Sequence, residues 1–176
     1  MRKALKFLLA VISILLLLSV VFYYWASAAT LPQESYSKII NKPITAEVDQ
    51  DSIYSILTYN VGYLSGMTNN KAVKRTKDLF DTNLKRLKNN LKTINPDIIA
   101  FQEIDFDADR SYHVNQMEAI SNIGYPYAAQ AINWDERYLP FPYGMPNKHF
   151  GQVISGQSIN SKYKIYVESQ LHCKMV

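Results

Sequence analysis

The chain has 176 residues, enough for one membrane anchor and one modest domain. Hydrophobic residues make up 48% and charged residues 19%, a globular composition that excludes a disordered chain. The net charge is +4, but three of the 19 basic residues are Arg2, Lys3 and Lys6, and the remainder of the chain is nearly neutral. Such a domain is a weak electrostatic match for nucleic acid, and the single cysteine, Cys173, excludes an internal disulfide.

The N-terminal segment predicts a membrane-spanning helix. Residues 4–25 carry one charge, Lys6, and the next charge is Glu34. About 20 apolar residues in an α-helix cross the bilayer core. Basic residues before the run predict a cytoplasmic N-terminus, and the aromatic residues 23–25 suit the far interface. We expect residues 1–30 to be a single-pass signal anchor with the domain on the extracytoplasmic side. A secreted domain is the alternative, because residues 26–28 fit a signal-cleavage pattern.

The first half of the domain shows a strand followed by a helix. Residues 31–52 contain prolines and scattered polar residues and predict a linker, so that the domain is expected over residues 53–176. Residues 53–60 are β-branched and aromatic and predict a strand. From about residue 70 to 93, apolar residues recur at a helical period, and the lysines between them are expected on a solvated surface.

The second half continues with strands and a short helix. Asn95-Pro96 ends the long helix, and residues 97–103 form an apolar run that predicts a buried central strand. A strand, a crossover helix and a strand imply an α/β arrangement. A short helix is expected at 114–122, and strands at 126–133, 152–159 and 163–167. The interpretation places a long loop at 134–150 and a turn at 160–161.

Two polar residues close the predicted strands. Asn60 ends the first strand, and Glu103 ends the second. Ligands collect beyond the carboxyl ends of strands in layered α/β folds. A carboxylate there is costly unless it is paired or binds a cation, and Mg²⁺ prefers oxygen ligands. From spacing alone, a structural Glu103 held in a salt bridge remains the alternative.

The sequence motifs around these residues resemble those of a known superfamily. Thr-Tyr-Asn-Val-Gly at 58–62 and Pro-Asp-Ile-Ile-Ala-Phe-Gln-Glu at 96–103 are similar to the first two motifs of the endonuclease/exonuclease/phosphatase superfamily. Residues 156–165 resemble a later strand motif, with Asn160 in place of the usual apolar residue. The resemblance covers roughly residues 53–167.

The resemblance implies a fold, a cofactor and site roles. The implied fold is an α/β (α+β) four-layered αββα sandwich with two mostly antiparallel sheets. Glu103 is the implied ligand of Mg²⁺ or Mn²⁺, and Asn60 is the amide beside it, facing the metal or the substrate. The implied function is a membrane-anchored phosphoesterase acting on a lipid, a sugar or inositol phosphate, or nucleic acid. No protein partner is predicted.

Other candidate residues lie outside these motifs. His149 is a candidate for proton transfer or phosphate binding, with a hydrogen-bonding loop histidine as the alternative. Arg137 and Arg110 are candidates for phosphate binding, with surface ion pairs as the alternative. The loop 138–150 is aromatic and proline-rich, and either packs or contacts substrate or membrane. Asp105, Asp107 and Asp109 are expected in a solvated acidic loop.

Two family motifs are missing. The family carries a Gly-Asp-Phe-Asn-like motif and a terminal Asp-His pair, whereas the three histidines here follow Tyr112, Lys148 and Leu171. We therefore expect the chain to represent the N-terminal part of such a domain, with little or no hydrolytic activity of its own. The competing hypothesis is a non-catalytic, membrane-tethered remnant or binding domain.

Overall fold

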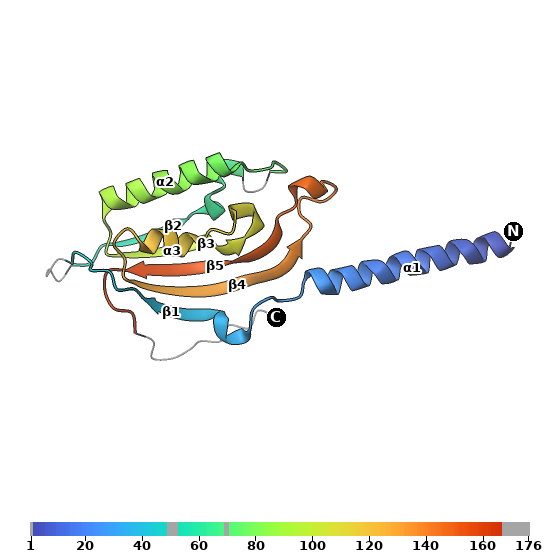
Figure 1. Cartoon of the computed structure of the whole chain (residues 1–176), viewed down its shortest axis with the longest axis horizontal. Helices are drawn as coiled ribbons and strands as arrows, with labels where there is room; N and C mark the ends of the chain where they lie inside the picture. The colour runs from blue at the N-terminus through green and yellow to red at the C-terminus, as the bar shows by residue number, and fades with distance from the viewer. Residues whose placement is uncertain (1, 49–52, 69–70, 167–176) are drawn as a thin grey trace.

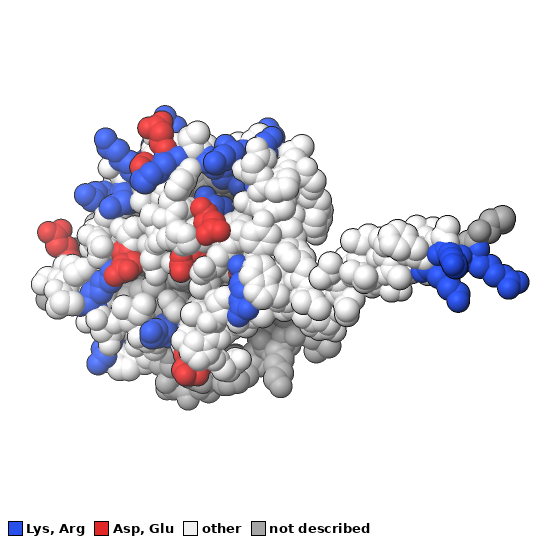
Figure 2. Space-filling model, turned by 45° about the vertical axis from the view of Figure 1, so that its right-hand side comes forward, with Lys and Arg blue, Asp and Glu red and all other residues white. Residues whose placement is uncertain are grey.

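A computed structural model of the chain describes residues 2–48, 53–68 and 71–166. Its first element is α1 (Arg2–Ala26), which projects away from the other elements (Figure 1). At about 1.5 Å per residue, its 25 residues are long enough for a bilayer core. None of its most apolar 18-residue window is buried, so the chain has one helix that could span a membrane or serve as a signal sequence. Its charged residues all lie near the N-terminal tip (Figure 2).

Five strands form one mixed sheet in the order β1-β4-β5-β3-β2. The strands are β1 (Ser37–Asn41), β2 (Ile56–Asn60), β3 (Ile98–Ala108), β4 (Tyr127–Leu139) and β5 (Gly151–Ser161). β2 and β3 are parallel, which requires the crossover that helix α2 (Lys77–Ile94) provides. The other neighbouring pairs are antiparallel. The α+β class is therefore confirmed.

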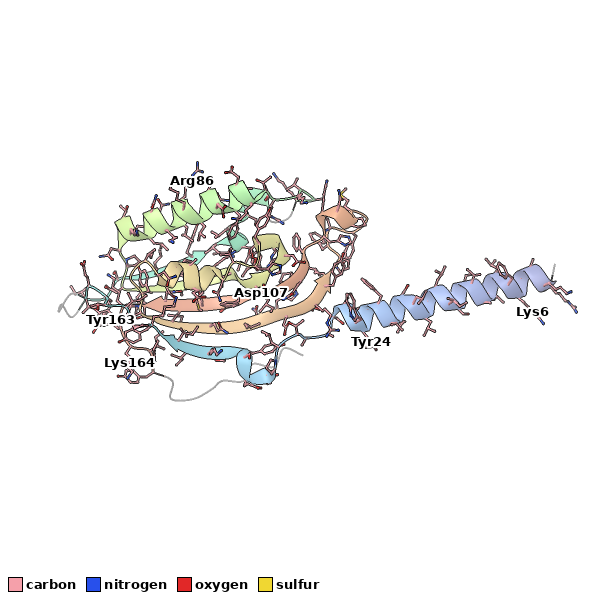
Figure 3. All side chains as sticks on the ribbon, in the orientation of Figure 1. Lys6, Tyr24, Arg86, Asp107, Tyr163 and Lys164 are labelled. Atoms are coloured by element: carbon pink, nitrogen blue, oxygen red, sulfur yellow. The ribbon has the colours of Figure 1, made fainter. Side chains whose placement is uncertain are left out.

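The strand registers define two ends of the sheet. Tyr127 pairs with Asn41 and Ser161, and Ile98 pairs with Ser161 and Ile56. These residues form the distal end. At the other end, which we call the anchor end, β4 finishes at Leu139 and contacts α1. Tyr163 and Lys164 lie at the distal end, far from α1, whereas Tyr24 lies where α1 approaches the sheet (Figure 3).

Helix α2 ends at the predicted Asn95-Pro96 boundary, but it begins at Lys77, about seven residues after the predicted start near residue 70. The Thr76 hydroxyl accepts a hydrogen bond from the Leu79 amide at 3.2 Å and caps the N-terminus. Asn95 adopts a left-handed conformation at the C-terminus, directly before Pro96. Arg86 points away from the sheet on the outer side of the helix (Figure 3), and the lysines on that side are exposed as predicted.

One face of the sheet carries the hydrophobic core. α2 and the short α3 (Gln116–Ser121) pack on this face. The core includes Phe80, Leu87 and Leu91 from α2, Ile99 and Phe101 from β3, and Met117 and Ile120 from α3. The opposite face carries Ile39, Ile56 and Ile159, which are 37%, 70% and 41% exposed. Within the described residues, this second face has no helical layer over it.

Four predicted boundaries are wrong because strand pairing extends further than the local pattern indicates, and a fifth is wrong because a predicted strand does not form at residues 163–166. The predicted linker, residues 31–52, contains a 3₁₀ turn at Gln33–Ser35 and the edge strand β1. β3 continues to Ala108 and β4 to Leu139, into segments predicted as loops. β5 runs through the predicted turn at 160–161, and residues 163–166 are not a strand. Residue 167, the end of that predicted strand, lies outside the described residues.

Asn160 is the departure from the family-like motif, and it has a structural partner. The side chain is fully buried, and its amide donates to Ser121 Oγ at 2.7 Å and to the Met117 carbonyl at 3.3 Å. These bonds join β5 to α3. The amide therefore replaces an apolar contact by two specific hydrogen bonds.

We expect Asn160→Ala to lower the free energy of unfolding by about 1–3 kcal/mol, because it removes both bonds and leaves buried acceptors without them. Chemical denaturation followed by circular dichroism measures this. Gln157→Ala, at an exposed position of the same strand, is the control and should change stability by less than about 0.5 kcal/mol. Equal effects of the two substitutions would contradict the role given to Asn160.

Candidate functional site

Glu103 lies at an irregularity of β3. The register with β5 shifts between Phe101 and Ile104, which marks a β-bulge. Glu103 has φ +53°, a left-handed conformation that is uncommon for a residue other than glycine. Bulges of this kind re-aim a side chain, and strained backbone is concentrated at functional sites. The half-buried Glu103 side chain therefore does not follow the regular alternation of side chains between the two faces of the sheet.

Asn60 ends the neighbouring parallel strand. It pairs with Gln102, the residue before Glu103, and the Val61 amide bonds to the Gln102 carbonyl at 3.0 Å. The Asn60 side-chain oxygen accepts a hydrogen bond from the Gly62 amide at 2.9 Å, which shapes the turn after β2. The two strand-end residues of the sequence prediction thus come from adjacent strands at the same level of the sheet.

A pocket of about 330 Å³ opens beside Glu103. Its lining residues are Tyr63, Glu103, Arg110, Trp134, Leu139, Phe141, Tyr143 and Phe150. We call it the Glu103 pocket. It combines one carboxylate, one guanidinium and several aromatic rings, and it draws them from the turn after β2, from β3, from β4 and from the loop 140–150. Asn60 is not among its lining residues.

Arg110 forms the floor of this pocket through a buried ion pair. Its Nη2 lies 2.7 Å from Asp105 Oδ1, and the two side chains are 4% and 0% exposed. Ser155 Oγ bonds to both partners, at 2.9 Å to Arg110 and 2.7 Å to Asp105. Asp105 was expected in a solvated loop and Arg110 in a surface pair, and both expectations are wrong. β3 continues past Glu103 and carries Asp105 into the core.

Aromatic rings surround the Arg110 guanidinium. Its central carbon lies 3.5 Å from the ring centre of Tyr63, 5.1 Å from that of Trp134 and 5.2 Å from that of Phe150. Burial raises the pKa of Tyr63; the charge of Arg110 opposes this rise and that of Glu103 adds to it. Tyr63 therefore keeps its proton at neutral pH and can donate a hydrogen bond towards a ligand.

Arg137 and His149 lie elsewhere. The exposed Arg137 has its guanidinium carbon 5.9 Å from the ring centre of Trp25, at the base of α1. His149 Nδ1 lies 2.6 Å from the Tyr138 hydroxyl, and the two rings meet edge to face. Neither residue lines the Glu103 pocket. The contact with Tyr138 agrees with the alternative interpretation of His149 as a loop histidine that makes a structural hydrogen bond.

The described residues contain no group of three or more His, Cys, Asp or Glu side chains that could together hold a metal ion. Glu103 would therefore need water or substrate oxygens to complete the coordination of a divalent cation. A larger hollow of about 390 Å³ lies at the distal end and includes Lys92, Asn95 and Lys162. Lys162 is already paired there with Asp97 at 3.2 Å, so we place the candidate site at Glu103 instead.

Sequence reasoning missed Tyr63 and Trp134 and misjudged Arg110. Tyr63 follows Asn60 by three residues, inside the loop that continues the first motif. Arg110 follows Asp105 by five residues, and this spacing in the sequence does not indicate that the two side chains meet. In the structure, a short 3₁₀ turn at Asp109–Ser111 brings the arginine back over the strand. Trp134 belongs to a strand predicted to end at residue 133.

No family model, no curated protein and no solved structure matches this chain. The resemblance to the endonuclease/exonuclease/phosphatase superfamily therefore rests on the sequence motifs at residues 58–62, 96–103 and 156–165.

The strain at Glu103 is testable by glycine replacement. A left-handed conformation costs a residue other than glycine roughly 1–2 kcal/mol, and replacement by glycine relieves this strain. The greater entropy of glycine in the unfolded chain offsets about 0.5–1 kcal/mol of that gain in stability. We expect Glu103→Gly to leave the free energy of unfolding unchanged or to raise it by up to about 1 kcal/mol. Gln102→Gly, at the preceding position without positive φ, should lower it by about 0.5–1 kcal/mol or more. A larger loss at Glu103 than at Gln102 would show that the bulge is not strained.

His113 gives the anchor end a pH dependence. Its ring bonds to Asp107 through Nδ1, and its Nε2 lies 3.0 Å from Asp109. The hydrogen bond to Asp107 raises the pKa of His113, and both carboxylate charges add to the rise. Because the pKa of His113 is higher in the folded protein than in the unfolded chain, the protonated ring stabilises the fold at pH values below the ordinary histidine pKa. This contribution is lost as pH rises through the folded-state pKa.

We therefore expect the free energy of unfolding to fall as pH rises from about 6 to about 8. The substitution His113→Asn should remove this dependence on pH. Asparagine tolerates the left-handed backbone of this position. Thermal unfolding at several pH values measures the effect. A slope that persists in the variant would assign the titration to another group.

Proposed function

We propose that this chain is a membrane-anchored, divalent-metal-dependent phosphoesterase module of the endonuclease/exonuclease/phosphatase type. The observation that carries the proposal is Glu103 in a left-handed β-bulge, directed to a pocket and placed next to the end of the parallel strand that carries Asn60. The left-handed backbone of Glu103 is uncommon for a residue other than glycine, and strained conformations of this kind are concentrated at functional sites.

The proposed architecture is the first part of a four-layered αββα sandwich. α2 and α3 supply the outer helical layer, and the five strands supply one sheet. The opposite face carries partly exposed isoleucines on three strands, and it is apolar enough to receive a second sheet. The exposed edge strand β2, with Ile56 and Tyr59 70% and 47% exposed, fits the same view.

The residues of the pocket have complementary roles in this proposal. Glu103 would hold Mg²⁺ or Mn²⁺ through its carboxylate, with Asn60 oriented towards the same region. A bound divalent cation polarises a phosphoryl oxygen and lowers the pKa of water. Tyr63 would donate a hydrogen bond to a phosphate oxygen. Arg110 is neutralised by Asp105, so we assign it a positioning role for Tyr63 and Trp134 rather than a direct charge contact.

A second candidate function is a tethered binding domain without hydrolytic activity. Two observations favour it over the enzyme. The described residues offer one carboxylate at the site and no cluster of three metal-binding groups. His149, the expected proton-transfer group, is held by Tyr138 outside the pocket. Such a module would bind a phosphoester without cleaving it.

Metal binding is the first test of these proposals. We expect the full-length chain in detergent micelles to bind one Mn²⁺, measured by the loss of the free Mn²⁺ signal in electron paramagnetic resonance. Glu103→Gln should weaken this binding by about tenfold or more, because it removes the anionic ligand. Glu118→Gln, which changes an exposed carboxylate on α3, is the matched control and should leave affinity unchanged.

The same proteins separate the two functions. Hydrolysis of bis(4-nitrophenyl) phosphate that requires Mg²⁺ or Mn²⁺ and is lost in Glu103→Gln supports the enzyme. Mn²⁺ binding that depends on Glu103, without hydrolysis, supports the binding domain. Equal Mn²⁺ binding in the two variants and the parent chain would refute both metal-based proposals.

A further inference from the structure

The segment after α1 is fixed to the sheet and does not act as a tether. Asp135 of β4 accepts hydrogen bonds from the Thr30 amide at 3.0 Å, the Thr30 hydroxyl at 2.7 Å, the Leu31 amide at 2.9 Å and the Tyr36 hydroxyl at 2.8 Å. Burial alone would raise the pKa of Asp135, but these hydrogen bonds outweigh it and lower that pKa. Residues 27–29 alone therefore separate the end of α1 from a docked backbone.

The last turn of α1 also contacts the domain directly. The Tyr138 ring lies 6.1 Å from that of Phe22 and 6.2 Å from that of Trp25, measured between ring centres. Arg137 covers the Trp25 ring from the side, and Ala26 is buried. Two independent contacts, one polar and one aromatic, thus fix how the domain is seated on the helix. If α1 crosses a bilayer, the anchor end of the sheet faces that bilayer.

Four apolar side chains are exposed in two loops at this end. In the loop 140–150, Tyr143 and Met145 are 77% and 40% exposed. Lys148 of this loop donates to the Ala72 carbonyl at 3.1 Å and so joins it to a second loop, in which Met67 and Val73 are 93% and 41% exposed. Figure 1 shows both loops at the end of the domain where α1 emerges. On the face drawn in Figure 2, the part of the domain beside α1 is largely uncharged.

We propose that the loop 140–150, with residues 66–68 and 71–74 beside it, inserts its apolar tips into the interface of the same bilayer that α1 spans. The occupant is a lipid membrane because this surface continues the aromatic end of α1, where tyrosine and tryptophan favour the interface. The exposed Lys71 and Lys74 beside Val73 add attraction to anionic headgroups. A soluble protein partner would not need the anchor-end position.

This contact determines where the Glu103 pocket opens. Four of its lining residues belong to the inserting loop or directly precede it: Leu139, Phe141, Tyr143 and Phe150. The mouth of the pocket therefore lies next to the lipid headgroups, whatever the pocket binds. The membrane contact itself does not depend on the proposed phosphoesterase function, and its test uses no substrate.

Site-specific fluorescence tests the insertion in the full-length chain. Cys173→Ser removes the single native cysteine, and Tyr143→Cys carries an environment-sensitive fluorophore. The protein is reconstituted in vesicles of phosphatidylcholine and phosphatidylglycerol. We expect a blue-shifted emission, quenching by lipids brominated near the headgroup, and several-fold weaker quenching by iodide than at the control site. That site is Ile53→Cys, 84% exposed and next to Tyr54, which contacts Tyr163 at the distal end.

Met145→Cys provides a second label in the same loop and guards against a local defect at Tyr143. Near-ultraviolet circular dichroism verifies that each labelled protein keeps its fold. Lipid quenching at both loop sites, with iodide quenching at residue 53, supports the proposal. Iodide quenching at residues 143 and 145 equal to that at residue 53 would overturn it. Vesicles of phosphatidylcholine alone then measure how much of the insertion depends on anionic lipid.

Discussion

The buried ion pair between Asp105 and Arg110 is the interaction on which the candidate site depends. Both side chains are almost fully buried, so neither charge could remain there without the other. Ser155 joins the pair to β5, and Tyr63 stacks on the guanidinium from the turn after β2. One arginine thus connects three neighbouring strands beneath the pocket. Its charge is used inside the protein, so Arg110 shapes the pocket and Glu103 is the carboxylate that lines it.

The β-bulge at Glu103 separates two acids that lie two residues apart on one strand. In a regular strand, residues 103 and 105 would point to the same face. The register shift and the left-handed backbone separate them: Asp105 turns into the core, and Glu103 reaches the pocket. Conformational strain is the cost of this separation.

The docking of residues 30–36 onto β4 changes how the anchor relates to the site. A flexible linker would let the domain sample many orientations above a membrane. Here Asp135 and the aromatic contacts of Tyr138 hold the sheet in one orientation relative to α1. If α1 crosses a bilayer, this seating sets the position of the Glu103 pocket relative to that bilayer.

The sequence by itself determined the elements whose signals are local: the apolar α1, the amphipathic α2 with its end at Asn95-Pro96, and the strand β2 with its end at Asn60. Only the tertiary structure decided the edge strand β1, the burial of Asp105 and the partners of Asn160. Those features depend on pairing with residues far along the chain. The local sequence indicates which residues are buried and whether the apolar residues recur with a helical or a strand period. It does not indicate which distant strand or side chain will form the hydrogen bond that a buried polar group needs.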